Sequence, residues 1–95
     1  MNKFYVVEAY QWSANNPNTH LRIIKDFIED VELISKGLWM PMLQTFELKE
    51  CLKLILNSGI AIYVFDSDWL VIDRKSETLK IVIDSDFKNL YAKCN

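Results

Sequence analysis

The stretch that decides the fold is residues 60–83, which read IAIYVFDSDWLVIDRKSETLKIVI. It holds three short runs, at 60–65, 69–73 and 79–83, that are rich in the β-branched and aromatic residues suited to a pleated sheet. The connections, Asp66-Ser67-Asp68 and residues 74–78, are short enough for tight antiparallel turns. The C-terminal third is therefore predicted to form three antiparallel strands.

Another strand is predicted at the start of the chain, where residues 4–12 read FYVVEAYQW. Both of its faces are mostly apolar, so we expect it to be covered on both sides. A lone strand cannot satisfy its backbone groups, so this segment must join the later strands across a long sequence gap. The predicted fold class is therefore α+β: a small, mainly antiparallel sheet of the N-terminal strand plus three C-terminal strands, with two or three helices packed on one face.

One helix is predicted over residues 19–31, after a cap at Asn18 or Thr19. A final short helix is predicted after a cap at Asp84 or Ser85. In each segment the apolar side chains fall on a single helical face. These apolar residues are Leu21, Ile24, Phe27, Ile28 and Val31 in the first segment, and Phe87, Leu90 and Tyr91 in the second.

The middle of the chain is harder to assign. Gly37 and Pro41 interrupt residues 32–44, which could form a short edge strand or a packed loop. Residues 46–57 fit two patterns, because Leu48, Leu52 and Leu56 belong both to a helical stripe and to a strand alternation broken only at Glu50. Cys51 and Ile55 complete the stripe, and Phe46 and Leu54 complete the alternation. We favour a helix that ends at Asn57-Ser58-Gly59, since glycine is common just after the last turn of a helix.

Length and composition indicate one ordinary globular domain over residues 1–95. The chain has 95 residues, of which 51% are hydrophobic and 25% charged, so it can bury enough apolar surface to fold. Its net charge of −2 excludes a strongly basic nucleic-acid binder and a highly acidic mimic of DNA, and we expect no nucleic-acid partner. A chain this short and this apolar also suggests a homodimer.

The two cysteines and the N-terminus favour a cytoplasmic protein. Cys51 and Cys94 belong to no CxxC or Cys/His cluster, which favours reduced thiols over a disulfide or a metal site. No signal peptide is visible, because Glu8 interrupts the first apolar run. The longest apolar run, residues 59–65, is far shorter than the roughly 20 residues of a membrane span, so no membrane partner is expected.

No cluster of residues indicates catalysis or a cofactor. His20 is the only histidine, and it falls at the start of a predicted surface helix without a nucleophile beside it. Asp66, Asp68, Asp73, Asp84 and Asp86 suit turns and caps, since the glycine and closing glutamate of a calcium loop are absent. With two glycines in the chain, phosphate-binding glycine loops are excluded. We therefore expect no catalytic residue, no metal and no cofactor.

Aromatic and methionine side chains are the better candidates for function. Trp39, Met40 and Met42 form an apolar segment around Pro41, and tryptophan and methionine are favoured in adaptable protein interfaces. Trp12 and Trp69 could stack on a partner if they were partly exposed, but core packing is the simpler expectation in a domain of this size.

Three short motifs stand near the two ends of the chain: Val7-Glu8-Ala9-Tyr10-Gln11-Trp12, Ser67-Asp68-Trp69-Leu70-Val71-Ile72 and residues 87–91. In this order they resemble the EAxQW, GDWII and closing FxxxY motifs of a family of small uncharacterised phage and prophage proteins. Ser67 stands in place of the glycine, the hairpin after Ile72 lacks a glycine turn, and residues 31–58 are longer than the usual version.

The resemblance implies a cytoplasmic, phage- or prophage-encoded accessory protein with a small α+β fold and no catalytic residue to carry over. It also implies structural roles for the motif residues, with Trp12 and Trp69 in the core, Asp68 in a turn and Tyr91 as an anchor of the last helix. The full motif set is Glu8, Gln11, Trp12, Asp68, Trp69, Phe87 and Tyr91.

Three functions are consistent with these observations. The first is an interaction module that binds a host or phage protein, because such a role needs no catalytic cluster. The second is a module that sequesters a nucleotide or metabolite in an aromatic-lined cleft. An enzyme ranks third, since it would require His20 and two of the aspartates to converge in one cleft.

Overall fold

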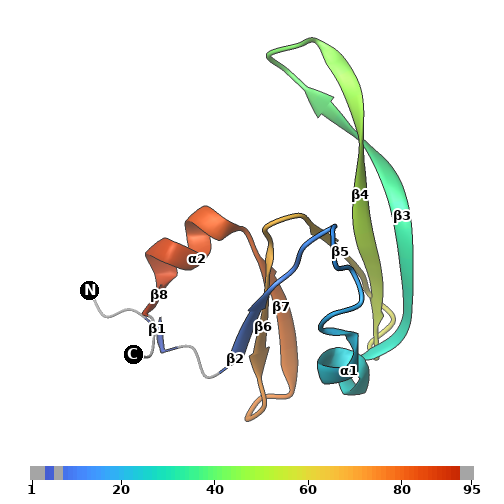
Figure 1. The fold of residues 1–95 in the computed structure, drawn as a ribbon. Coiled ribbons are helices and arrows are strands. Elements are labelled where there is room, and N and C mark those ends of the chain that lie inside the picture. Colours follow the sequence, from blue (N-terminus) through green and yellow to red (C-terminus); the bar gives the residue numbers. More distant parts are fainter. Residues whose placement is uncertain (1–3, 6–7, 93–95) are drawn as a thin grey trace.

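The computed structural model describes residues 4–5 and 8–92 of the chain. Val6, Val7 and Cys94 of the sequence predictions lie outside the described residues. The elements follow one another along the chain as shown in Figure 1. They are β1 (Phe4–Tyr5), β2 (Glu8–Gln11), α1 (Leu21–Ile24), η1 (Lys25–Phe27, a 3₁₀ turn), β3 (Ile28–Met40), β4 (Thr45–Leu56), β5 (Ala61–Phe65), β6 (Trp69–Asp73), β7 (Thr78–Val82), α2 (Asp84–Leu90) and β8 (Tyr91–Ala92).

The first antiparallel sheet has the order β2-β6-β7 and joins the two ends of the chain, as predicted. Gln11 of β2 pairs with Trp69 of β6, and two further backbone bonds extend the contact. In these bonds the Trp12 amide donates to the Asp68 carbonyl at 2.8 Å, and the Ser67 amide donates to the Trp12 carbonyl at 3.0 Å. The predicted strands 69–73 and 79–83 are confirmed to within one residue.

The second antiparallel sheet, β3-β4-β5, corrects the predicted layout. The predicted strand at 60–65 is present as β5, but it pairs with β4 and does not join the N-terminal strand. The helix expected over residues 46–57 is strand β4, so the alternating pattern was the correct reading of that segment. Gly59, with φ of 89°, belongs to the β4–β5 turn and not to the end of a helix.

The prediction of a helix over residues 19–31 is also largely wrong. Only Leu21–Ile24 are α-helical and Lys25–Phe27 form a 3₁₀ turn, after which Ile28 adopts the extended φ of −125°. The four-residue helix α1 is marginal on its own, because its few hydrogen bonds do not offset the entropy lost in nucleating a helix. The long ladder between β3 and β4 begins at Ile28, so Ile28, Asp30 and Val31 of the predicted helix pair with β4 instead.

The core lies between the two sheets. Ile24 of α1 is fully buried at one end of this core, while α2 lies on the opposite side of the β2-β6-β7 sheet (Figure 1). The fold is mixed α+β, as predicted. The prediction that the helices pack on one face of a single sheet is wrong. The buried cluster consists of Trp12, Ile24, Leu52, Leu54, Val64, Leu70, Ile72 and Leu79.

Candidate protein-interaction surface

The hairpin of β3 and β4 extends well beyond the rest of the molecule (Figure 1). β5 pairs with β4 only from Cys51 to Ile55, so residues 45–50 of β4 have β3 as their neighbour on one side alone. We call residues 35–50, which include this free part of both strands and their turn, the arm. Residues 41–50 are all exposed to solvent.

One face of the arm is apolar and continues directly from the core. The β3–β4 register pairs Trp39 with Phe46 and Leu33 with Leu52, which places these side chains on the same face as Leu48. Leu52 is buried, whereas Trp39 is 51% exposed, Phe46 70% and Leu48 75%. The face that closes the core near the body therefore remains open to solvent along the arm.

The apolar side chains at the far end of the arm form an ordered group. The rings of Trp39 and Phe46 pack edge to face across the two strands, with 5.1 Å between their centroids. Beyond them the turn exposes Met42 by 95% and Leu43 by 68%. Met40 is half-buried and, because it directly follows Trp39 along β3, lies on the other face.

The sequence identified only part of this surface. It singled out Trp39, Met40 and Met42, and the structure brings these residues together at the end of the arm. It missed Phe46 and Leu48, because residues 46–57 were expected to form a helix, with Leu48 on its apolar stripe, and that helix does not form. The alternation of apolar and charged residues over 46–49 was the signal that could have placed them on one strand face.

The other face of the arm carries Lys36, Glu47 and Lys49 beside the half-buried Leu38 and Met40. Lys36 and Lys49 are paired across the strands, and the Lys49 ammonium lies 3.1 Å from the Glu47 carboxylate. Near the body, the Lys36 ammonium lies 3.8 Å above the centre of the Tyr63 ring, a cation–π contact. Cys51, which also lies on this side, is fully buried, and burial raises the pKa of its thiol. The arm is therefore amphipathic.

The motif residues lie away from the arm, in contacts that hold the first sheet against α2. The Trp69 indole donates to Asp84 at 2.8 Å, and its ring stacks on Phe87 with 4.0 Å between centroids. The Gln11 amide donates to Asp84 at 3.3 Å and to the carbonyl of Ser67 at 3.1 Å. Each of these contacts joins segments that are distant in sequence, so this group acts as a structural tie.

The remaining motif residues also make structural contacts. Trp12 is 1% exposed and its indole donates to the Pro17 carbonyl at 3.1 Å. Asp68 accepts a hydrogen bond from the Phe65 amide at 2.9 Å within the turn, while burial raises the pKa of its carboxyl group. Ser67 beside it has φ of 76°, the left-handed conformation that glycine adopts at least cost. The backbone of Tyr91 pairs in β8, and the role expected for its ring stays a prediction.

Glu8, at the start of β2, forms an ion pair with Arg74 in the β6–β7 turn. Its carboxylate accepts two hydrogen bonds from the Arg74 guanidinium, which holds the pKa of Glu8 below its ordinary value. The Tyr10 hydroxyl donates to the same carboxylate at 3.2 Å. This contact ties β2 to the β6–β7 turn.

The candidate catalytic residues are not drawn together. His20 has its Nε2 atom 3.2 Å from the Gln11 carbonyl, and its ring lies 5.0 Å from that of Tyr10. Over residues 4–5 and 8–92, no group of three or more His, Cys, Asp or Glu side chains is placed to hold a metal ion. The aspartates Asp66 and Asp73 instead accept hydrogen bonds from nearby backbone amides.

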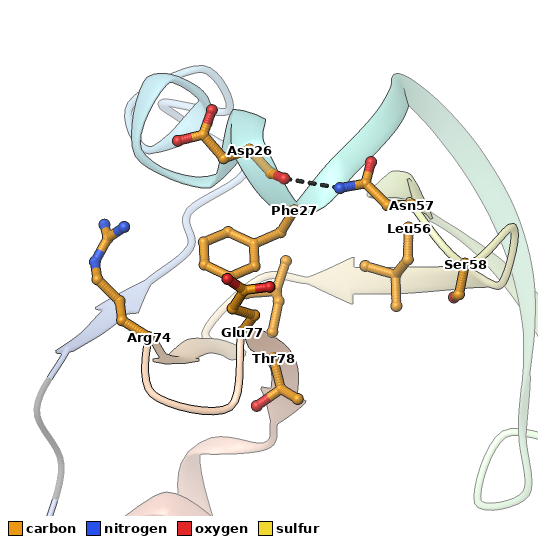
Figure 2. Close-up of a pocket in the computed structure, with 9 residues that line it drawn as sticks. Asp26, Phe27, Leu56, Asn57, Ser58, Arg74, Glu77 and Thr78 are labelled. Carbon is orange, nitrogen blue, oxygen red and sulfur yellow. Dashed lines mark hydrogen bonds between the residues drawn. The ribbon is translucent and has the colours of Figure 1, made fainter.

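A hollow of about 620 Å³ opens between η1, the β4–β5 turn and the β6–β7 turn. Figure 2 shows the Phe27 ring in the middle of its lining, with Arg74 to one side and Ser58 to the other. Asn57 closes one wall, because its side-chain amide donates to the Asp26 carbonyl at 2.7 Å. None of the three tryptophans lines this hollow, so it is not the aromatic cleft that the sequence suggested.

The chain matches no known protein family, and no similar curated protein or solved structure was found. Among the described residues, no helix is both long and apolar enough to span a membrane. What the structure defines is thus a mixed α+β domain from which an amphipathic β-arm projects.

Proposed function

We propose that this chain is a phage- or prophage-encoded accessory protein that binds a host or phage protein through the apolar face of its arm. The observation that carries the proposal is the distribution of exposed apolar side chains. In the part of the chain that the structure describes, the largest such group lies on the arm or at its base. Its members are Leu33, Trp39, Met42, Leu43, Phe46 and Leu48.

The shape of this surface indicates the kind of partner. Exposed apolar patches are costly to keep in water, and on soluble proteins they commonly mark interaction sites. The Trp39–Phe46 pair presents a rigid aromatic anchor, which is the type of group that dominates binding energy in protein interfaces. Met42 at the tip adds a side chain that adapts to irregular pockets. A partner with an apolar groove would cover this face and leave the charged face in solvent.

Small-molecule binding is the alternative, and the hollow lined by Phe27 would be its site. The only guanidinium there, that of Arg74, is already paired with Glu8, whereas Asp26 and Glu77 contribute carboxylates. This lining favours a ligand with hydrogen-bond donors over a phosphate group. A thermal-shift screen of amine, polyol and nucleotide compounds tests it, and a flat screen would remove the alternative.

An arm-dependent capture experiment tests the main proposal. Tagged wild-type protein and the double variant Phe46→Ser/Leu48→Ser would be incubated with lysate of a bacterial host, and captured proteins quantified by mass spectrometry. Ile60→Ser is the matched control, because Ile60 is 60% exposed but lies in the β4–β5 turn.

We expect the wild type and the Ile60 control to enrich the same protein and the arm variant to lose it, with all three melting at similar temperatures. Equal enrichment by the arm variant would contradict the proposal. So would the absence of any protein whose capture depends on the arm.

A further inference from the structure

The free edge of β4 carries backbone groups that can pair with another strand. At the base of this strand the Leu56 amide donates to the carbonyl of Ile60, the residue just before β5, so Leu56 directs its backbone groups toward the edge that β5 covers. Alternate residues of an antiparallel strand face the same side. The register shift between Ile28 and Asp30 places its extra residue on β3, so β4 itself keeps this alternation from Leu56 to Thr45. The amides and carbonyls of Phe46, Leu48 and Glu50 therefore point to the edge that β5 leaves uncovered.

This edge is an exposed strand of the kind that pairs with another chain unless something blocks it. Residues 45–50 read TFELKE, with no proline and no β-bulge to prevent pairing. Within the described part of the chain, the ladder supplies these residues with a neighbouring strand on the β3 side alone.

The charges on this segment select one way for two copies to meet. When two identical strands pair antiparallel about a two-fold axis, one residue faces its own copy. With Glu47, Lys49 or Glu50 at the axis, like charges would be opposed, which is destabilising. With Leu48 at the axis, Glu47 of each copy faces Lys49 of the other, and the two leucines face each other.

The length of the edge supports the same register. With Leu48 at the axis, Phe46 faces Glu50 of the second copy, and the pairing stays within the uncovered residues 45–50. With Phe46 at the axis, Leu48 would instead face Gln44, which belongs to the turn and has a left-handed φ of 51°. That register would run off the end of the strand.

We propose that the arm pairs with the arm of a second copy of this chain through the β4 edges, centred on Leu48. The two arms then form one four-stranded antiparallel sheet in the order β3-β4-β4-β3. About the axis, the pairs Phe46–Glu50, Leu48–Leu48 and Glu50–Phe46 are hydrogen-bonded pairs, which exchange about six backbone hydrogen bonds between the copies. The interface is isologous, so it closes with two copies and does not propagate into a fibre.

The side chains of this dimer separate by face. The Glu47 and Lys49 side chains of the two copies alternate on the charged face, where the same residues already form an ion pair within one chain at 3.1 Å. The two Leu48 side chains meet on the other face, beside the Trp39–Phe46 pairs. Pairing by the edge leaves the apolar face accessible, so the dimer would present a doubled binding surface, and its existence does not depend on the proposed partner.

Charge reversal tests this pairing without disturbing the fold, because the side chains of Glu47 and Lys49 are 45% and 46% exposed. The single variants Glu47→Lys and Lys49→Glu each place like charges opposite one another across the axis. We expect both to weaken dimerisation about tenfold or more in sedimentation velocity, because two cross-strand pairs change from attraction to repulsion. Lys80→Glu, an exposed charge reversal on β7, is the control and should dimerise like the wild type.

The decisive measurement uses a mixture of the two single variants. Glu47→Lys carries two lysines at these positions and Lys49→Glu carries two glutamates, so a mixed dimer regains both attractive pairs. We expect the mixture to form a heterodimer although neither variant dimerises well alone. A monomeric wild type, or single variants that dimerise as tightly as the wild type, would overturn the pairing whatever the capture experiment finds.

Discussion

Replacing two leucines of β4 by alanine, one at a time, separates the part of the strand that holds the fold together from the part that we propose for binding. Leu52 and Leu48 lie on the same face of the same strand. Leu52 is 2% exposed within the core between the sheets, whereas Leu48 is 75% exposed on the arm. The two substitutions are chemically identical, so a difference between them reports the surroundings alone.

The expected losses in the free energy of unfolding differ several-fold. Truncating a buried leucine removes its favourable transfer from water and leaves a cavity, which together cost about 2–5 kcal/mol. A domain of this length has a total stability of about 5–14 kcal/mol, so Leu52→Ala should remove a large share of it. Leu48 is only one-quarter covered, and its truncation should cost about 0.5 kcal/mol or less.

Urea unfolding followed by tryptophan fluorescence measures both losses. The protein should be dilute, so that the proposed dimer is dissociated and does not add to the stability of the arm. We expect the Leu52→Ala midpoint to fall with an unchanged slope, and the Leu48→Ala curve to overlie that of the wild type.

Two results would refute this reasoning. If Leu48→Ala lost as much stability as Leu52→Ala in dilute solution, the arm would be packed against the body and not free. If Leu52→Ala lost less than about 0.5 kcal/mol, the core would not lie between the two sheets.

Two carboxyl groups are expected to change stability in opposite directions with pH. Arg74 lowers the pKa of Glu8 below 4.5, so their ion pair stabilises the fold above that pH and this contribution is lost as the pH falls through the lowered pKa. Arg74→Met should therefore reduce stability at neutral pH and hardly at all in acid, and NMR titration should show the Glu8 pKa rising toward 4.5. Burial raises the pKa of Asp68 above 3.8, so its ionisation destabilises the fold as the pH rises through the raised pKa. Asp68→Asn keeps an acceptor for the Phe65 amide, and its stability relative to the wild type should increase from acid to neutral pH in urea unfolding at each pH; no such trend would contradict the assignment.

The elements with short-range signals were predictable from the sequence. The β6–β7 hairpin follows from two apolar runs and a short polar connection, and these features act locally. The last helix follows in the same way from the apolar spacing around Phe87, although Asp84 and Ser85, expected as caps, are helical residues and Tyr91 lies in β8. That the N-terminal strand joins the C-terminal strands was predictable as well, because a lone strand cannot satisfy its backbone groups, but its pairing with β6 in particular was not predicted.

The middle of the chain could not be assigned in this way. In residues 46–57 the apolar side chains fit both a helical face and an alternating strand, so the local pattern leaves the choice open. Cys51 and Leu52 are adjacent in sequence and both buried, because β4 is covered on both of its faces near the body. Such a pair looks like part of a helical stripe unless the neighbouring strands are known.

The candidate interaction surface was likewise predictable only in part. By itself, the sequence determined that Trp39 and Met42 are apolar residues beside a proline turn, and that no reactive cluster is apparent along the chain. Only the tertiary structure decided that Phe46 and Leu48 join them on one exposed face. The physical reason is that exposure depends on where β5 stops pairing with β4. β5 ends at Phe65, where the chain turns away from β4, and this turn is held by bonds from Ser67 to Trp12 and from Ala14 to Asp66, contacts distant in sequence that no local spacing encodes.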